Sequence, residues 1–441
     1  MITNEATRLF ISQHANDNIR TLALAAHGKP DIDLPFALDQ IAGRQSARKK
    51  LPSWHAIEGI IFPPHLSMEQ CSSEATALYK QSLLERLVCQ DGGISSFADL
   101  TGGFGVDFSF LASRFGKAIY VERQQRLCDI ATHNFKLLGL TQAEVVCDEA
   151  ESWLKIMPRV DLVYLDPARR DAHGARTFAI ADCTPNVVTL KSLLLEKAGK
   201  VMIKLSPMLD WRKAVSDLGE ENVSEVHAVS VNNECKELLL VMTPEKAEAI
   251  EIVCVDIRSN DGEVKEVKEV KEVKEVKVFK EVKGDGEVKE VKEVKEVKDN
   301  TGSRSNIFDY SVFSTLQNPS FLYEPNASLM KIGCFDMIEE RFGVCQVSAN
   351  SHLFVSDHEV KDFPGRSFHI VGITTMNKRE MKDALADIKS ANITVRNFPL
   401  TTAELRKKLK LKDGGDVYIF ATTFEDNQHR LIICKKALKN T

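Results

Sequence analysis

The spacing of apolar residues along the 441-residue chain defines its regions before any motif is considered. Over the first ninety residues, apolar positions such as Leu9, Phe10, Ile19 and Leu22 recur at roughly helical intervals. An apolar stripe of this period is typical of amphipathic helices that share a core. The pattern therefore predicts a helical N-terminal domain over residues 1–92.

Beyond residue 93, short apolar runs alternate with longer amphipathic stretches. The candidate strands are residues 97–100, 117–122, 143–148, 160–167 and 200–207. Such alternation is typical of a parallel α/β sheet with helices on both faces. Two further runs, 223–231 and 237–243, predict an antiparallel hairpin at the edge of this sheet, with its turn around Asn232 and Asn233. We expect the α/β domain to cover residues 93–245.

A tandem Glu-Val-Lys triplet fills most of residues 263–298. A period of three matches neither the 3.6-residue period of a helix nor the 2-residue period of a strand, so the valines do not gather on one face. Such composition is typical of a solvated low-complexity segment, mobile or loosely helical. We interpret residues 246–304 as a linker that contains this insertion and assign it no chemistry.

Two small modules are expected after the linker. Residues 305–365 predict an α+β domain, with a helical stretch over 323–343 and a strand-like stretch over 344–356. From residue 366 the order is strand, helix, strand, helix and a closing hairpin. This predicts a βαβαββ module with its own core over residues 366–441.

Composition excludes several classes of protein. The ten cysteines form no CxxC pair, so neither a zinc site nor a disulfide framework is expected. No apolar run approaches the roughly 18 residues of a membrane helix, and the N-terminus lacks the layout of a signal peptide. We expect a cytoplasmic protein without metal or membrane contacts.

Although the whole chain has a net charge of −5, its C-terminal region is basic. From Arg366 onward, 15 Lys or Arg residues face 8 Asp or Glu residues. Arg406, Lys407 and Lys408 lie on one short predicted helix, as a stripe suited to binding phosphates. The alternative interpretation is a merely solvated basic face.

A glycine-rich turn follows the first strand of the α/β domain. Asp99 ends that strand, and Thr101, Gly102, Gly103 and Gly105 follow before an amphipathic helix. Glycines let the backbone approach a ligand closely, and the helix offers free N–H groups at its start. The dinucleotide fingerprint needs a small residue where this chain has Phe108. An NAD-dependent oxidoreductase is therefore disfavoured, although it remains an alternative.

Two further acidic residues end the next two strands. Glu122 can accept hydrogen bonds from both ribose hydroxyls of a nucleoside, and Asp148 can accept one from an adenine amino group. Open α/β sheets bind ligands at the carboxyl ends of their strands. With the turn at Asp99, this arrangement resembles class I methyltransferases, which have a Rossmann-like sheet and use S-adenosylmethionine (SAM). Thr101 stands where that family usually has a glycine. The resemblance implies a cofactor site formed by Asp99, Thr101, Gly102, Gly103, Gly105, Glu122 and Asp148.

The fourth strand ends in Asp166, Pro167, Ala168, Arg169 and Arg170. This run resembles the Asp-Pro-Pro-Tyr motif of enzymes that methylate a nitrogen of a base. Alanine replaces the second proline, and arginine replaces the aromatic residue. The resemblance implies catalytic roles for Asp166, Pro167 and Arg169.

Substrate contacts and a cover for the cofactor are also implied by the family resemblance. Arg170 and Lys204 are candidates for substrate binding, although a solvated lysine explains Lys204 equally well. Gln70, Ser72 and Ser73 precede the sheet, where many family members close over the methionine end of SAM.

Most of the chain outside the triplet segment is similar to bacterial methyltransferases that carry a C-terminal THUMP-like domain, chiefly over residues 51–80, 99–107, 164–170 and 322–333. We expect residues 366–441 to be that THUMP-like domain and residues 305–365 to be ferredoxin-like. THUMP domains of other enzymes bind RNA, so the resemblance implies methylation of a base in tRNA or rRNA. It also implies RNA contacts for Arg406, Lys407 and Lys408. The alternative is a non-catalytic RNA- or protein-binding protein on a degenerate methyltransferase fold.

Overall fold

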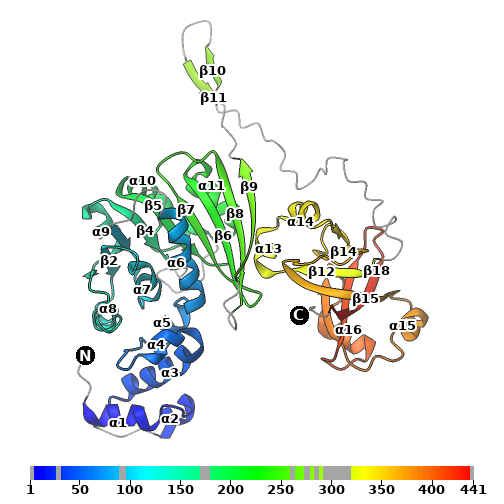
Figure 1. Ribbon diagram of the computed structural model, residues 1–441, viewed down its shortest axis with the longest axis horizontal. Coiled ribbons are helices and arrows are strands. Elements are labelled where there is room, and N and C mark those ends of the chain that lie inside the picture. Colours follow the sequence, from blue (N-terminus) through cyan, green and yellow to red (C-terminus); the bar gives the residue numbers. More distant parts are fainter. Residues whose placement is uncertain are drawn as a thin grey trace. The chain divides into compact units, whose positions relative to one another are not determined.

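A computed structural model describes residues 4–25, 31–88, 96–168, 179–258, 264–272, 279–282, 288–291 and 319–437. The statements below concern these ranges. The chain divides into two compact units, Met1–Lys271 and Glu272–Thr441, and each is described by itself (Figure 1).

Helices form the N-terminal part of the first unit, as the apolar spacing predicts (Figure 1, blue). Asn4 and Asp33 begin two of them by accepting hydrogen bonds from backbone N–H groups of the first turn. Phe10, Leu22 and Ile41 pack together in a small core. The helices are α1 Glu5–Gln13, α2 Ile19–Ala25, α3 Leu34–Lys50, α4 Pro52–Ala56, α5 His65–Gln70 and α6 Glu74–Val88.

A nine-stranded sheet follows, in the order β3-β2-β1-β4-β5-β7-β6-β8-β9. The first five strands in this order are parallel, and β7 runs antiparallel to β5. The strand order reverses between β1 and β4, which is where open α/β sheets form their ligand crevice. The strands are β1 Ser96–Asp99, β2 Lys117–Glu122, β3 Ala143–Cys147, β4 Val160–Leu165, β5 Ala198–Leu205, β6 Val223–Val231, β7 Glu234–Met242, β8 Ala249–Ile257 and β9 Val264–Glu272.

Helices connect the parallel strands of this sheet (Figure 1). Phe97 of the first strand stacks on Phe108, which itself stacks on Phe135, so the aromatic residue that disfavours a dinucleotide fingerprint is part of the core. The helices are α7 Val106–Ala112, α8 Gln125–Leu137, α9 Ala150–Ile156, α10 Val187–Lys197 and α11 Trp211–Leu218, with 3-10 turns η1 Ile180–Asp182 and η2 Glu220–Asn222.

The predicted hairpin exists, but it is not at the edge of the sheet. Asn232 and Asn233 form its turn with φ angles of 50° and 63°, a conformation that asparagine tolerates well. Beyond β6 the sheet continues through β8 and β9. The α/β domain therefore extends past residue 245, and the expected linker 246–304 is wrong over these two strands.

The start of the triplet segment forms the edge strand β9 rather than a mobile or loosely helical loop. In an extended strand a three-residue period places successive valines on opposite faces, so Val264 is exposed and Val267 is buried. Lys268 pairs with Glu251 of β8 at 2.7 Å. An edge strand can leave one of its faces exposed to solvent. The triplet repeat can therefore form an edge strand, although only some of its valines are buried. Further along, β10 Phe279–Val282 and β11 Val288–Val291 pair only with each other.

The second unit contains a seven-stranded sheet in the order β13-β14-β12-β15-β18-β17-β16. Its strands are β12 Phe321–Pro325, β13 Cys345–Gln346, β14 Phe354–Ser356, β15 Gly365–Thr375, β16 Asn392–Arg396, β17 Val417–Thr423 and β18 His429–Lys436. Its helices are α13 Ala327–Ile332, α14 Phe335–Phe342, α15 Lys378–Ala384 and α16 Thr402–Leu409. The βαβαββ order expected from residue 366 is confirmed, with β15 beginning at Gly365. The expected helical stretch 323–343 is partly wrong, because its first residues belong to β12.

Both C-terminal modules contribute to this one sheet, since β12 and β15 pair over five residues. Met381 and Leu405, from the two helices of the last module, pack against Ile419 and Leu431 of its strands.

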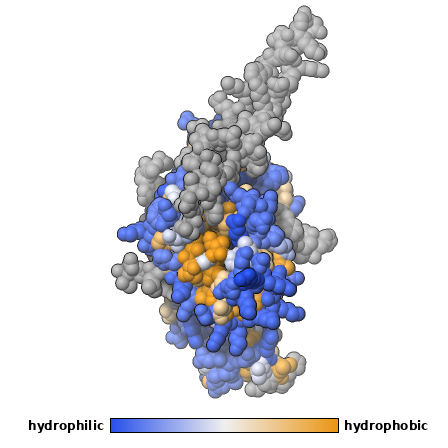
Figure 2. All heavy atoms as spheres, turned by 90° about the vertical axis from the view of Figure 1, so that its right-hand side faces the viewer, coloured by the Kyte–Doolittle hydropathy of each residue, from blue (hydrophilic) through white to orange (hydrophobic). Residues whose placement is uncertain are grey.

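Figure 2 shows a face that is mostly hydrophilic around a hydrophobic patch. Among the described residues of this unit, the large apolar side chains that are exposed are Val371 and Ile373 of β15.

Candidate active site

A cleft of about 1090 Å³ lies at the carboxyl ends of the parallel strands of the first unit. Ligand pockets of this position and size are typical of open α/β folds. The structure brings together here the sequence-predicted residues Asp99, Thr101, Gly102, Gly103, Gly105, Glu122, Asp148, Asp166, Pro167 and Lys204. Gln70, Ser72 and Ser73 line it too. Arg169 and Arg170 lie outside the described residues, and Arg406, Lys407 and Lys408 belong to the second unit.

Steric contacts explain the glycines of the turn after β1. A Cβ on Gly102 would lie 2.2 Å from the ring of Tyr120, and one on Gly105 would lie 2.8 Å from Phe135. Gly103 and Gly105 have φ angles of 56° and 82°, in the region that favours glycine. The Tyr120 hydroxyl donates a hydrogen bond to the carbonyl oxygen of Gly103 at 2.5 Å. The turn is thus held against the sheet in one conformation.

The carboxylate of Glu122, at the end of β2, is almost fully buried beside this turn. Its Oε2 accepts a hydrogen bond from the N–H of Gly103 at 3.0 Å, and its Oε1 accepts one from the N–H of Gln124 at 2.9 Å. The N–H of Asp148 donates to the Glu122 carbonyl at 3.2 Å, which places the third acidic residue beside the second. Each oxygen of a carboxylate can accept more than one hydrogen bond, so both acids can also bind a ligand.

Thr101 connects the ends of β1 and β4. Its N–H donates to Oδ1 of Asp99 at 2.9 Å, and its Oγ1 accepts a hydrogen bond from the N–H of Asp166 at 2.6 Å. A glycine at this position could not make the second bond. The replacement of the family's usual glycine therefore has a structural function in this chain.

Asp99 is a buried carboxyl group, and the structure records no cation beside it among the described residues. Burial raises the pKa of Asp99 well above its ordinary value, and the nearby carboxylates of Asp107 and Asp166 act in the same direction. The hydrogen bond from Thr101 opposes this shift. A cationic group that entered the cleft next to Asp99 would therefore be bound favourably.

An ionic cluster whose grouping the sequence did not predict lies at the cleft, which four of its five members line. It consists of Ser72, Lys80 of α6, Asp107 of α7, Lys204 of β5 and Glu237 of β7. Lys80 is fully buried, and its Nζ lies 2.5 Å from Glu237 Oε1 and 3.1 Å from Asp107 Oδ1. The available sequence signal was a charged residue inside an apolar run, as in the strand around Lys204, because a buried charge requires a partner.

Asp107 is the centre of this cluster. Its Oδ2 accepts hydrogen bonds from the hydroxyls of Ser72 and Tyr164, both at 2.7 Å. Burial alone would raise the pKa of Asp107, but Lys80 and Lys204, together with these hydroxyls, lower it to about 2. Asp107 is therefore ionised at every pH at which the protein would be assayed.

The segment after β4 carries the candidate catalytic residues. Asp166 is partly exposed to the cleft, and its Oδ2 accepts a hydrogen bond from Lys204 at 2.6 Å. Ala168 and Thr184 exchange two backbone hydrogen bonds of 2.8 and 3.0 Å, which hold the segment after Pro167. The alternative of a solvated Lys204 is wrong, because this side chain is buried and bound to Asp166.

The basic helix of the second unit is only partly free to bind a ligand. Lys407 and Lys408 of α16 are exposed. Arg406 instead donates a hydrogen bond to the Ala391 carbonyl at 3.0 Å and pairs with Asp413 at 2.6 Å. Arg406 therefore stabilises its own module, which disagrees with its predicted place in a phosphate-binding stripe.

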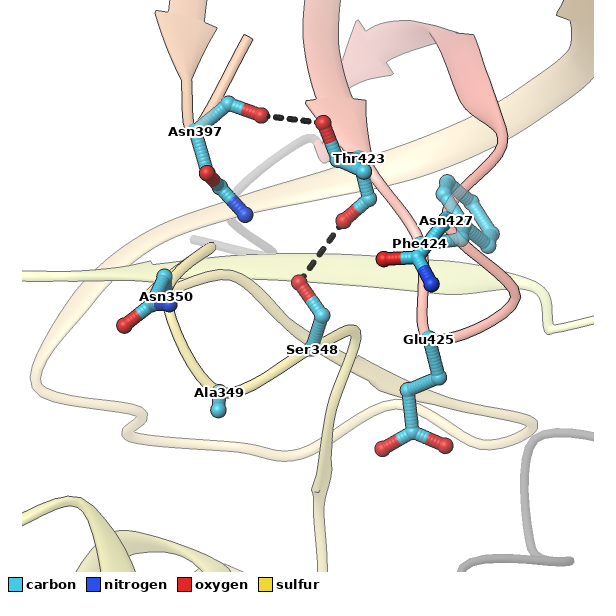
Figure 3. A pocket seen from close by; sticks show the side chains of 8 residues that line it. All are labelled: Ser348, Ala349, Asn350, Asn397, Thr423, Phe424, Glu425 and Asn427. Atoms are coloured by element: carbon cyan, nitrogen blue, oxygen red, sulfur yellow. Dashed lines mark hydrogen bonds between the residues drawn. The ribbon is translucent and has the colours of Figure 1, made fainter. Parts of the chain in front are cut away.

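A second cavity, of about 500 Å³, lies in this unit beside the ends of β16 and β17 (Figure 3). The Ser348 hydroxyl donates to the Thr423 carbonyl at 2.7 Å, and the Thr423 hydroxyl donates to the Asn397 carbonyl at 2.5 Å. Its other lining residues are Ala349, Asn350, Phe424, Glu425 and Asn427. The lining has one acidic and no basic side chain, so this cavity does not extend the basic helix.

Neither metal-binding groups nor membrane spans are seen in the described ranges. There, no three His, Cys, Asp or Glu side chains are grouped so that they could hold a metal ion. No helix in the same ranges is long and apolar enough to cross a membrane.

Comparison with known proteins gives matches in both units. Residues 365–436 match the model of a THUMP-like domain, and residues 321–364 match that of a ferredoxin-like domain. A solved structure from Porphyromonas gingivalis W83, named as a candidate methyltransferase, is 28% identical with a TM-score of 0.76, covering 99% of this chain and 100% of that chain. A SAM-dependent methyltransferase from Agrobacterium tumefaciens is 15% identical with a TM-score of 0.29, covering 38% of this chain and 62% of that chain. No curated protein matches the sequence.

The full-length match and the two domain matches confirm the resemblance stated from the sequence. The fold is that of a Rossmann-like methyltransferase sheet with a helical N-terminus and with ferredoxin-like and THUMP-like domains at the C-terminus.

Proposed function

We propose that this chain transfers a methyl group from SAM to a nucleotide base in RNA. The observation that carries the proposal is one cleft in which Asp99, Glu122, Asp148 and Asp166 converge from the ends of four parallel strands. The fold of the chain, which is that of methyltransferases with a THUMP-like domain, supports the same proposal.

The residues of the cleft fit the chemistry of SAM. Asp99 is a buried carboxyl group that would be stabilised by a cation, and the methionine end of SAM carries an ammonium group. Glu122 lies beside the glycine turn, where its carboxylate can accept hydrogen bonds from the ribose hydroxyls. Asp148 lies next to it, at the end of β3, where it can accept one from the adenine amino group. When bound, SAM supplies an activated methyl group on its sulfonium.

Asp166 is a candidate catalytic residue that lines the same cleft as the cofactor site. One of its carboxylate oxygens is bound to Lys204, and the structure records no partner for the other among the described residues. That oxygen can accept the N–H of a base and direct the nitrogen lone pair toward the methyl group. We propose that Pro167 and Arg169 shape the surrounding base pocket, and that Arg170 contacts the RNA.

RNA as substrate rests on the THUMP-like domain and on charge. THUMP domains of other enzymes bind RNA, and residues from Arg366 onward carry the basic excess of a chain whose net charge is −5. Lys407 and Lys408 are exposed there and can contact phosphates without losing another partner.

The decisive experiment compares RNA from cells with and without the gene by mass spectrometry of nucleosides. A methylated base should disappear in the deletion strain and return with the wild-type gene, but not with Asp166→Ala.

In a second experiment, calorimetry should show that Asp99→Ala and Glu122→Ala weaken SAM binding by about 1–3 kcal/mol. Glu144→Ala, an exposed acid of β3 outside the cleft, is the matched control.

Two results would favour the alternatives. If the purified protein binds SAM and RNA but transfers no methyl group in a single turnover, it is a binding protein on a degenerate fold. If NAD and not SAM raises its melting temperature, it is an oxidoreductase.

A further inference from the structure

The ammonium group of Lys204 is held by three protein side chains. Its Nζ donates to Asp166 Oδ2 at 2.6 Å and to Ser72 Oγ at 3.2 Å, and it lies 3.7 Å from Asp107 Oδ2. The side chain is almost fully buried. Two hydrogen bonds and one ion pair, all to protein groups, therefore hold an ammonium group that is almost entirely shielded from a phosphate of the substrate.

The partners of Lys204 are themselves fixed. Asp107 accepts hydrogen bonds from Ser72 and Tyr164 and pairs with Lys80. Lys80 in turn pairs with Glu237, and these groups are buried. A lysine held by several buried groups cannot change its orientation when a substrate enters. It therefore holds the carboxylate of Asp166 in one position.

We propose that Lys204 is a positioning residue for methyl transfer, which holds Oδ2 of Asp166 in place and leaves its Oδ1 to accept an N–H of the nitrogen to be methylated. This inference rests on the function proposed above and narrows its substrate to a base nitrogen that carries hydrogen. The nitrogen lone pair forms the new N–C bond as the S–C bond breaks, and the nitrogen then loses the proton held by Asp166 to water in the open cleft.

The charges around Asp166 make Lys204 the group that holds it in place. Among the described residues that face Asp166, Asp99 of β1 and Asp107 of α7 are acidic, and Lys204 of β5 is the cation. Without Lys204, the carboxylate of Asp166 would lose the hydrogen bond to its Oδ2 and would be repelled by these acids.

The test replaces Lys204 with glutamine and measures kcat and KM for methyl transfer. The probe is total RNA from the deletion strain with radiolabelled SAM. In Lys204→Gln kcat should fall at least about tenfold while the KM for SAM stays near its wild-type value, and Lys204→Arg should keep most of the wild-type kcat. The matched control is Lys200→Gln, because Lys200 lies on the same face of β5 but donates to the Leu87 carbonyl instead of to Asp166.

The ¹³C NMR signal of the Asp166 carboxyl group, assigned with Asp166→Asn, reports its surroundings without RNA. This signal should move in Lys204→Gln, where the hydrogen bond from Nζ is lost, and should stay unchanged in Lys200→Gln. Lys204→Met is the second neutral variant if the glutamine variant does not fold. An unchanged Asp166 signal in a folded neutral variant overturns the inference, whereas a wild-type protein without methyl transfer refutes only the proposed function.

Discussion

Thr101 accepts a hydrogen bond from the backbone N–H of Asp166, and so the cofactor turn and the candidate catalytic segment are joined directly. The two residues belong to different strand ends that are 65 positions apart. Any shift of the turn is therefore transmitted to the carboxylate that we expect to hold the substrate.

Thr101→Val tests this connection, because valine keeps the shape of threonine and removes the hydroxyl. An unpaired, partly buried N–H costs about 1–3 kcal/mol. We expect methyl transfer to fall about ten- to hundredfold, while Thr101→Ser, which keeps the hydroxyl, retains most of the activity. Equal rates for the valine and serine variants would show that the bond to Asp166 does not matter.

The raised pKa of Asp99 predicts a pH dependence of SAM binding. In the empty cleft this buried carboxyl keeps its proton at pH values where an exposed aspartate is ionised. A bound ammonium group favours the carboxylate, so binding releases a proton. SAM affinity should therefore be highest above the raised pKa and should fall, by up to about tenfold per pH unit, as the pH drops below it.

Calorimetry in buffers of different ionisation enthalpy counts the released proton. Asp99→Asn should bind SAM more weakly and without proton release. Wild-type binding that is independent of pH and of buffer would place the ammonium group away from Asp99.

The triplet segment should tolerate replacement in one part and not in the other. Replacing residues 273–298 with a short Gly/Ser linker removes β10 and β11, which pair only with each other, so the melting temperature should hardly change. Replacing residues 264–298 also removes β9, with buried Val267 and the pair of Lys268 with Glu251. This second variant should melt several degrees lower, and equal melting temperatures for the two would mean that β9 adds no stability.

RNA binding should depend on the exposed lysines of α16. Lys407→Ala with Lys408→Ala should weaken binding of the deletion-strain RNA and reduce the salt dependence of the affinity by about two in slope at most. SAM affinity, measured on the same protein, should not change. Arg406→Ala is a separate variant, for which we expect lower stability because of its bonds to Ala391 and Asp413. Unchanged RNA affinity and salt slope in the double variant would exclude this helix from the RNA contacts.

The sequence by itself determined the local features of this protein. The apolar periods identified the N-terminal helices and the parallel strands, because side chains that face one core must repeat with the period of their own element. Acidic residues at strand ends and the glycine turn located the cleft, since the carboxyl ends of parallel strands meet at one edge of a sheet.

Only the tertiary structure decided which charges are partners. Lys80, Asp107 and Glu237 are far apart in the chain, and nothing local marks them as one cluster. The same holds for Lys204, which the sequence left open between a solvated and a substrate-binding role, and for Arg406 with its contacts to Ala391 and Asp413. Buried charges find their partners through the packing of distant elements, and that packing is not encoded in the period of any single segment.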